Sequence, residues 1–138
     1  MQGHRFEMRL DCHYAKENSI DSLKVEHLDG DEWKSLELDT LTPGFLIFTY
    51  AVFTCQHMFL RANANERGLQ LASSSGSIMI DAASDWKIEK LHVAFDATLE
   101  AGTPTADDID YITGRMQQCP VSKNLGEIHD TQTELLFA

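Results

Sequence analysis

The sequence predicts a single α+β domain that spans residues 1–138. Strand-like segments come first, one long apolar helix follows, and two further strands, short helices and a closing strand complete the order. This order differs from the regular alternation of strand and helix that indicates a parallel α/β sheet. Hydrophobic residues make up 43% of the 138 residues and charged residues 24%, which is the composition of a folded globular protein.

The N-terminal part of the chain predicts short strands joined by polar turns. Apolar and charged side chains alternate over positions 6–10, as on a strand with one buried face. Positions 23–27 repeat this period, and Asp29-Gly30 is a strong signal for a hairpin turn. We therefore expect positions 33–38 to form the returning strand.

A long buried helix is predicted to begin after Thr42-Pro43. Thr42 is expected to cap the free N–H groups, Pro43 fits the first turn, and Gly68 suits the C-terminal end. Over positions 44–53 almost every residue is apolar, which predicts a helix that is buried on all sides. One small chain offers too little surface to cover such a helix, so we expect an intimate homodimer.

Two strands are expected to follow this helix, over positions 70–80 and 86–99. In the second strand the apolar positions change register, so we expect a bulge near Glu89-Lys90. Its end is marked by a Gly-Thr-Pro segment that breaks the strand.

The C-terminal part predicts two helices and a closing strand. Thr105 is expected to cap the first helix. Pro120 fits the first position of a short second helix over 119–126, and positions 127–137 are expected to form the closing strand.

The charge balance argues against nucleic-acid and membrane-surface partners. Eleven Lys and Arg residues against 22 Asp and Glu residues give a formal net charge of −11, and such a surface repels phosphate backbones and anionic lipid. The apolar run over 45–60 is interrupted by polar residues and is short for a membrane span. The N-terminus shows no apolar secretory segment. A cytoplasmic protein is therefore expected.

Three cysteines are present, Cys12, Cys55 and Cys119, and none belongs to a Cys-x-x-Cys pair. Their spacing, taken with that of the histidines, fits no recognised metal site, so we expect no metal and no other cofactor. Cys55 lies in the middle of the long helix, whereas Cys119 directly precedes a helix start, where free N–H groups favour thiolate over thiol. Buried free cysteines are more often plain core residues, so both interpretations stay open.

Two segments resemble the OsmC/Ohr family, the osmotically inducible and organic-hydroperoxide-resistance proteins. The helix that begins at Thr42-Pro43, carries Cys55 and leads into Arg-Gly-Leu at 67–69 is similar to the central helix of that family. The segment over 119–125, which begins Cys-Pro-Val-Ser, resembles its Cys-Pro-hydrophobic-Ser motif. The resemblance implies an intertwined homodimer in which antiparallel sheets from both subunits wrap two long central helices.

The resemblance also implies the reduction of organic hydroperoxides by a pair of thiols. Cys55 matches the residue that attacks the peroxide oxygen and becomes a sulfenic acid. Cys119 matches the residue that condenses with it to a disulfide, which an external dithiol then reduces. Such chemistry needs a dry pocket for the alkyl part of the peroxide. The residues expected to line this pocket are Phe45, Phe48, Phe53, His57 and Phe59.

The match to the family fails at two charged positions. Active members carry a Glu just after the Pro at the helix start, whereas this sequence has Gly-Phe-Leu at 44–46. They also carry an Arg from the N-terminal strand region that contacts the reactive sulfur, and Arg9 is the best candidate for it here. Without these groups burial disfavours the Cys55 thiolate, so a weak or altered activity is expected.

Three functions therefore stay open: a weak thiol peroxidase, a non-catalytic protein of the same fold that binds a small apolar ligand, and a dimeric scaffold with inert thiols. The helix-start setting of Cys119 favours the peroxidase. His57 lies two residues after Cys55 and so points about 200° away from it on a helix. We expect it either to reach the reactive sulfur across a dimer interface or to face the dimer axis or solvent.

Overall fold

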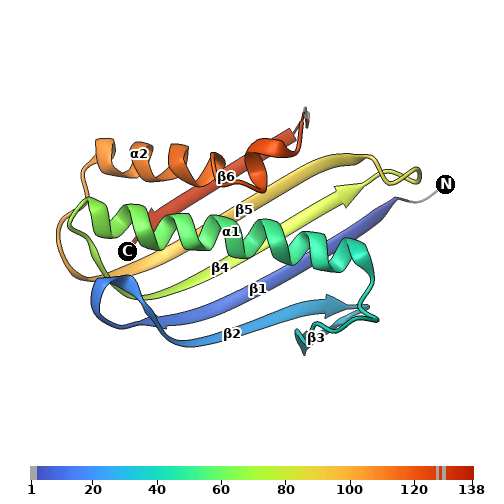
Figure 1. Ribbon diagram of the computed structural model, residues 1–138, viewed down its shortest axis with the longest axis horizontal. Helices are drawn as coiled ribbons and strands as arrows, with labels where there is room; N and C mark the ends of the chain where they lie inside the picture. The colour runs from blue at the N-terminus through green and yellow to red at the C-terminus, as the bar shows by residue number, and fades with distance from the viewer. Residues whose placement is uncertain (1–2, 127, 129) are drawn as a thin grey trace.

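A single six-stranded sheet carries two helices on one of its faces (Figure 1). The computed structural model describes residues 3–126, 128 and 130–138. The strand order is β3-β2-β1-β4-β5-β6, which confirms the predicted α+β class. The strands are β1 (His4–Tyr14), β2 (Ile20–Asp29), β3 (Glu32–Ser35), β4 (Gln70–Ala82), β5 (Ile88–Ala101) and β6 (Asp130–Phe137). The helices are α1 (Gly44–Glu66) and α2 (Ala106–Gln117), and two 3₁₀ turns span Lys16–Asn18 and Ser122–Asn124.

The predicted hairpin turn and the predicted β-bulge are both present. The β2–β3 hairpin turns at Asp29-Gly30, where Gly30 has φ of 65°, a left-handed conformation that glycine adopts without strain. In the β4–β5 pair, Asp81 pairs with Lys90 and Ala82 pairs with Ile88. The residue between those two partners is therefore left out of the pairing, which confirms the predicted bulge.

The last strand corrects the expectation of purely antiparallel sheets. Strand β6 runs parallel to β5, with pairs from Lys90↔Asp130 to Ala97↔Phe137. Two neighbouring parallel strands need a crossover connection, and α2 provides it by carrying the chain back along the face of the sheet. Of the predicted strand over 127–137, Glu127 and His129 lie outside the described residues.

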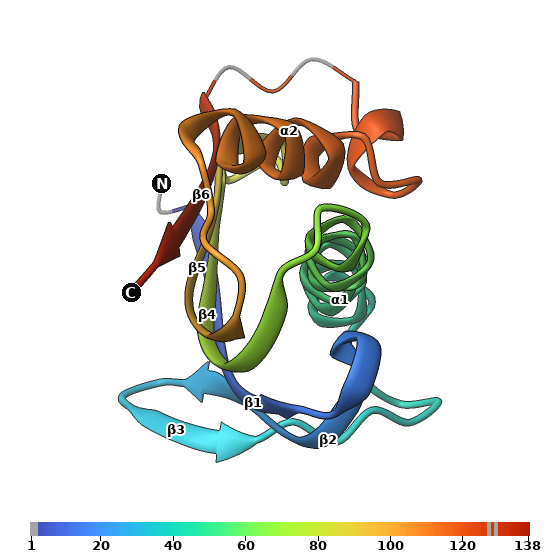
Figure 2. The same ribbon diagram turned by 90° about the vertical axis from the view of Figure 1, so that its left-hand side faces the viewer.

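The sheet bends around α1 (Figure 2). Strands β4 and β5 flank the helix on one side, β1 and β2 curve beneath it, and α2 lies along it on the side opposite to β1 and β2. Side chains at alternate strand positions point to α1 and form the core with it, because successive strand residues face opposite sides of a sheet. The largest fully buried members of this core are Met8, Phe53, Leu60, Leu71, Ile78, Ile80, Leu91, Phe95, Ile112 and Met116.

Within one copy of the chain, helix α1 is not buried on all sides. Val52 and Phe53 are fully buried against the sheet, but Ile47 is 40% exposed and Met58 is 52% exposed. The sheet and α2 leave one flank of the helix without a covering element among the described residues (Figure 2), so burial on all sides would need the expected second copy of the chain. By length and hydropathy α1 also fits a membrane-spanning helix, a property that core helices of water-soluble proteins share.

The two helix starts differ in how they are capped. Thr42 does not cap α1, because the residue at the cap position is Pro43 and the Thr42 hydroxyl instead accepts the Asp39 backbone N–H at 2.9 Å. Thr105 does cap α2, and it forms a reciprocal capping box with Asp108. Its hydroxyl accepts the Asp108 N–H at 3.1 Å, and the Asp108 carboxylate accepts the Thr105 N–H at 3.0 Å.

Candidate functional site

Cys55 and Cys119 lie in contact, although they belong to distant parts of the chain. Cys55 comes from the middle of α1, and Cys119 comes from the turn that follows α2. Both are buried, with 8% and 0% of their surface exposed. Burial raises the pKa of the Cys55 thiol to about 11, and the contact with Cys119 raises it further. A hydrogen bond from the Val121 backbone N–H lowers the pKa by a smaller amount.

A tight turn fixes the sulfur of Cys119. The Lys123 N–H donates to the Cys119 carbonyl at 2.9 Å, and Pro120 occupies the first position of the turn. The sulfur then accepts the Ser122 N–H, with a distance of 3.4 Å, and lies 3.1 Å from the Ser122 hydroxyl oxygen. The predicted short helix over 119–126 is thus reduced to a 3₁₀ turn over Ser122–Asn124 with Val121 at its cap position, so Cys119 lies three residues before the turn and not directly at a helix start.

A buried glutamine extends this hydrogen-bonded group. Gln56 follows Cys55 on α1 and is 1% exposed. Its amide Nε2 donates to the Ser122 hydroxyl at 3.1 Å, and its Oε1 accepts the Thr133 hydroxyl of β6 at 3.2 Å. Gln56 was not among the site residues that the sequence predicted. The available signal was an amide side chain inside an otherwise apolar helical run, since buried polar groups need partners.

A cavity of about 260 Å³ adjoins this group within one subunit. Its walls combine aliphatic side chains with amides and hydroxyls, and none of its lining residues in the described part of the chain is charged. The lining residues are Gln56, Leu91, Gln117, Ser122, Leu125, Gly126, Ile128 and Thr131.

Arg9 is not at this site, contrary to the sequence expectation. On β1, Met8 and Leu10 are buried toward α1, so Arg9 points to the opposite face of the sheet. There it forms an ion pair with Glu26 at 2.8 Å, and its guanidinium lies 4.2 Å from the ring centre of Trp33. The alternation of β1, a local property of the strand, is what keeps Arg9 away from Cys55.

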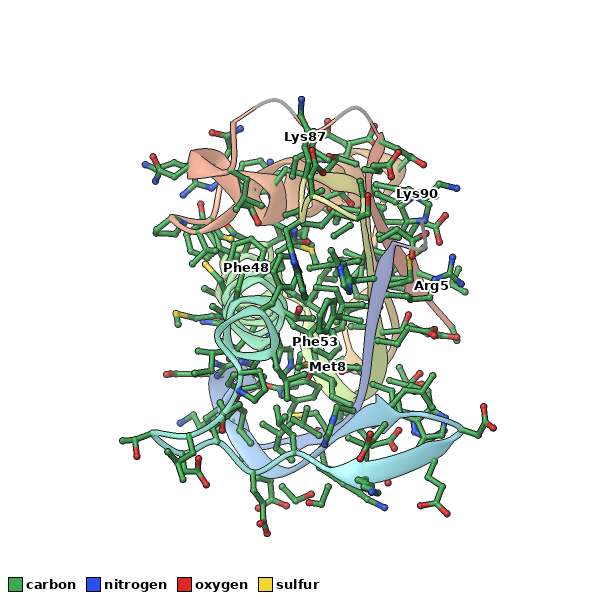
Figure 3. The ribbon with its side chains drawn as sticks, turned by 90° about the vertical axis from the view of Figure 1, so that its right-hand side faces the viewer. Arg5, Met8, Phe48, Phe53, Lys87 and Lys90 are labelled. Carbon is green, nitrogen blue, oxygen red and sulfur yellow. The ribbon has the colours of Figure 1, made fainter. Side chains whose placement is uncertain are left out.

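Within one subunit the predicted aromatic residues do not line the cavity beside the thiols. Phe53 is in the core against Phe95, with ring centres 5.7 Å apart, and Figure 3 shows it between α1 and the sheet together with Met8. Phe45 and Phe48 pack with each other at the start of α1, with ring centres 5.4 Å apart. The remaining predicted phenylalanine, Phe59, lies under the guanidinium of Arg115, 5.9 Å from it. None of these residues lines the cavity at Gln56 and Ser122.

His57 is a core residue of its own subunit and faces neither a dimer axis nor solvent. It is 2% exposed, its Nε2 lies 2.7 Å from the Tyr14 hydroxyl, and its ring stacks on Phe95. Burial, together with the nearby Arg61 charge, lowers the pKa of His57 to about 4. A neutral, enclosed imidazole of this kind has no access to Cys55 of either subunit.

Among the described residues, the groups that shift the pKa of Cys55 are Cys119 and Val121, and neither carries a carboxylate or guanidinium. The first turn of α1, which lies wholly within the described residues, contains no carboxylate. Among the described residues no group of three His, Cys, Asp or Glu side chains is arranged to hold a metal ion.

Comparison with known proteins identifies the class of fold. The chain superimposes on an OsmC-like hydroperoxide resistance protein from Jannaschia sp. CCS1 with a TM-score of 0.59 at 13% identity, covering 91% of this chain and 89% of the other. An OsmC-like protein of unknown function from Vibrio cholerae gives 0.54 at 12% identity, covering 82% and 84%. The OsmC-like protein from Mycoplasma pneumoniae gives 0.53 at 7% identity, covering 100% and 96%.

The chain therefore has the fold of OsmC-like proteins, as the sequence resemblance implied. The amino-acid sequence itself matches no protein-family model and no curated protein. At such low identity the likeness establishes the fold, and the activity has to be argued from the residues of this chain.

Proposed function

We propose that this chain is a divergent OsmC/Ohr protein that reduces organic hydroperoxides through Cys55 and Cys119. The single observation that carries the proposal is the contact between these two thiols, which the fold brings together from α1 and from the turn after α2. A two-cysteine peroxidase requires a second thiol next to the one that is oxidised, and this pair of free thiols meets that requirement.

The chemistry follows from the pair. One thiolate attacks an oxygen of the hydroperoxide, so that an S–O bond forms, the O–O bond breaks and the alkoxide leaves as an alcohol after taking up a proton. The second thiol attacks the resulting sulfenic acid, which forms the disulfide and releases water. An external dithiol then reduces the disulfide and returns both cysteines to thiols.

A homodimer is part of the proposal. Ile47 and Met58 form an apolar stripe along the flank of α1 that the sheet and α2 leave open. A second copy of the chain would cover this stripe and place both central helices side by side. The net charge of −11 supports a water-soluble, cytoplasmic enzyme without nucleic-acid or membrane partners.

We expect the enzyme to be slow. Burial raises the pKa of Cys55 to about 11, so only a very small fraction of this thiol is ionised at pH 7. Arg9, the candidate for the arginine that contacts the reactive sulfur in active family members, pairs with Glu26 on the other face of the sheet.

The test is consumption of cumene hydroperoxide in the presence of a dithiol. The wild-type protein and Cys12→Ser, which removes a buried thiol outside the pair, should turn over at similar rates. Cys55→Ser and Cys119→Ser should each lose multiple turnover. Equal, background-level consumption by all four proteins would remove the enzymatic function.

A second candidate function is the binding of a small apolar ligand without chemistry. The observation that favours it is the lining of the cavity, whose members in the described part of the chain are uncharged and offer aliphatic side chains to a bound molecule. Saturable binding of cumyl alcohol, the unreactive product of the same substrate, in a protein that consumes no peroxide would support this function.

A further inference from the structure

We propose that Gln56 is a positioning residue for the two thiols. It holds the segment 118–125, which carries Cys119, against α1 and thereby sets how readily the disulfide with Cys55 forms. The inference rests on the proposed peroxidase function and deepens it, since this disulfide closes the oxidative half of the cycle. Gln56 directly follows Cys55 on α1 and is 1% exposed, so its amide lies inside the fold beside the pair.

The segment 118–125, which follows α2, is hydrogen-bonded to α1 at two neighbouring positions. Most of its backbone N–H groups bond within the segment or to the end of α2. Among the residues that the structure describes, two further bonds lead from it to α1. The Val121 N–H donates to the Cys55 sulfur. The Ser122 hydroxyl accepts the Gln56 amide, with 3.1 Å between Nε2 and the oxygen, so loss of Gln56 removes one of the two bonds.

The bond from Gln56 is independent of the redox state of the thiols. In the reduced protein the Cys119 sulfur lies 3.1 Å from the Ser122 oxygen, and its S–H donates to that oxygen. Formation of the disulfide removes this proton. The Gln56 N–H needs neither thiol proton, so it can hold Ser122 both before and after the two sulfurs join.

Thr133 of β6 fixes the direction of the amide. Its hydroxyl donates to Gln56 Oε1 at 3.2 Å, so the Nε2 end of the amide faces Ser122. A buried amide costs free energy unless its polar atoms are bonded, and with both ends bonded it specifies one arrangement of the three segments. An apolar side chain of similar size fills the space but selects no such arrangement.

The chemical step needs the Cys119 sulfur in place. When the peroxide has oxidised Cys55 to a sulfenic acid, the Cys119 thiol attacks that sulfur. The S–S bond forms, the S–O bond breaks, and the departing hydroxide takes the Cys119 proton and leaves as water. The same contact governs the equilibrium of the pair with other thiols, because a higher effective concentration of one thiol at the other stabilises the disulfide.

Apolar packing also holds the segment 118–125, in a less specific way. Val121 and Leu125 are partly buried against the core. This packing keeps the segment near α1 when the Gln56 bond is lost, so we expect a looser contact between the sulfurs and not an unfolded protein.

The deciding measurement is the equilibrium of the pair with glutathione. The two protein thiols and one glutathione disulfide give the protein disulfide and two glutathione molecules, so the equilibrium constant is a concentration that reports how closely the sulfurs are held. Free thiols are alkylated and counted by mass spectrometry, and of the three cysteines only Cys12 should be alkylated in the disulfide form. Gln56→Leu should lower the constant about tenfold, a shift of about 30 mV.

Gln117→Leu is the matched control. Gln117 is an exposed residue of α2 that lines the same cavity as Gln56, whereas the Ser122 hydroxyl bonds to Gln56. Its replacement should leave the equilibrium constant within about twofold of the wild-type value, because the bond to Ser122 stays intact.

Gln56→Glu supplies a readout that a loss of packing would not produce. The introduced carboxyl keeps the shape of the amide. When protonated it can donate to Ser122 and accept from Thr133, whereas when ionised it can only accept. Burial raises the pKa of such a carboxyl. Relative to the wild-type protein at the same pH, the equilibrium constant should be close to equal at pH 6 and should fall to the level of Gln56→Leu at pH 8.5.

The results that would overturn the inference are distinguishable from a failure of the proposed function. A wild-type protein that forms the disulfide, with the same constant in Gln56→Leu, leaves the peroxidase function standing and removes Gln56 as a positioning residue. An equal loss in Gln117→Leu, or a constant ratio of Gln56→Glu to the wild type between pH 6 and pH 8.5, also overturns it. A wild-type protein that forms no Cys55–Cys119 disulfide even with cumene hydroperoxide removes the proposed function as well. Should thermal unfolding show that Gln56→Leu does not fold, the pH profile of Gln56→Glu decides.

Discussion

Individual side chains in this protein show how much local pattern determines and where it stops. Helical geometry correctly separated His57 from Cys55, because two residues along a helix turn a side chain to another face. It did not predict that the sheet bends around α1 and encloses His57 against Tyr14 and Phe95. That enclosure depends on contacts between distant segments, which periodicity does not contain.

The buried His57 makes stability depend on pH. Its folded-state pKa of about 4 lies below the ordinary value of 6.5, so the unfolded chain binds the proton more tightly between these values. Stability is therefore fully present above about pH 6.5 and falls by about 2–3 kcal/mol as the pH drops to about 4.

Urea unfolding at intervals between pH 7.5 and pH 4.5 measures this effect. The variant His57→Gln, which lacks the titrating group, should show a flatter profile over that range. The surface carboxylates of Glu26 and Asp81 have pKa values lowered by Arg9 and Arg5, so their contribution is lost below the window of His57. Parallel profiles for the wild-type protein and His57→Gln would contradict the assignment.

At the scale of single elements, β4 and β5 approach closely at a glycine. A Cβ atom on Gly76 would lie 2.6 Å from Phe95 Cε1, and Phe95 is 2% exposed and has little room to move. We expect Gly76→Ala to destabilise the fold by about 1–3 kcal/mol, the usual cost of overfilling a packed core.

Chemical denaturation of Gly76→Ala beside Ser77→Ala measures this cost. Ser77 is the next residue on β4 and its side chain is exposed on the other face of the sheet, so its replacement should change stability by less than about 0.5 kcal/mol. Equal effects of the two variants would mean that Phe95 moves aside without cost.

The two threonines that precede helices provide a second test at this scale. Thr105→Ala removes the capping box of α2 and should cost about 1 kcal/mol. Thr42→Ala serves as the matched control, because Thr42 makes its contacts with Asp39 in an exposed loop and caps no helix. Denaturation curves should separate the two variants, and a larger loss for Thr42→Ala would contradict the capping assignment.

Sequence patterns predicted the elements well and their environment less well. Alternation predicted β4, β5 and the bulge between them because these features arise from neighbouring residues. The same reasoning treated Thr42 as the cap of α1, whereas its hydroxyl bonds to Asp39, and it did not indicate which flank of α1 the sheet leaves open. Likewise, the contact of Gln56 with Ser122 and Thr133 joins three distant segments and exists only in the folded chain.

At the scale of the whole molecule, the open flank of α1 predicts the oligomeric state. Met58→Lys places a charge in the apolar stripe and should convert a dimer into monomers, as sedimentation velocity would show. Leu41→Lys changes a side chain that is 89% exposed in the loop before α1 and should leave the dimer intact. A monomeric wild-type protein at micromolar concentration would contradict this part of the proposal.

The whole fold also explains why two thiols far apart in sequence meet. Helix α1 presents Cys55 toward the side on which α2 lies, and the turn after α2 returns the chain to that side, so Cys119 arrives at the same place. Sequence resemblance supplied the identity of the pair, whereas the surrounding donors and cavity are properties of this chain.

Peptide mapping after treatment with one equivalent of cumene hydroperoxide tests the central claim most directly. The account predicts a single new disulfide that joins Cys55 to Cys119, with Cys12 recovered as a free thiol. Recovery of all three cysteines as thiols, or a disulfide that includes Cys12, would contradict it.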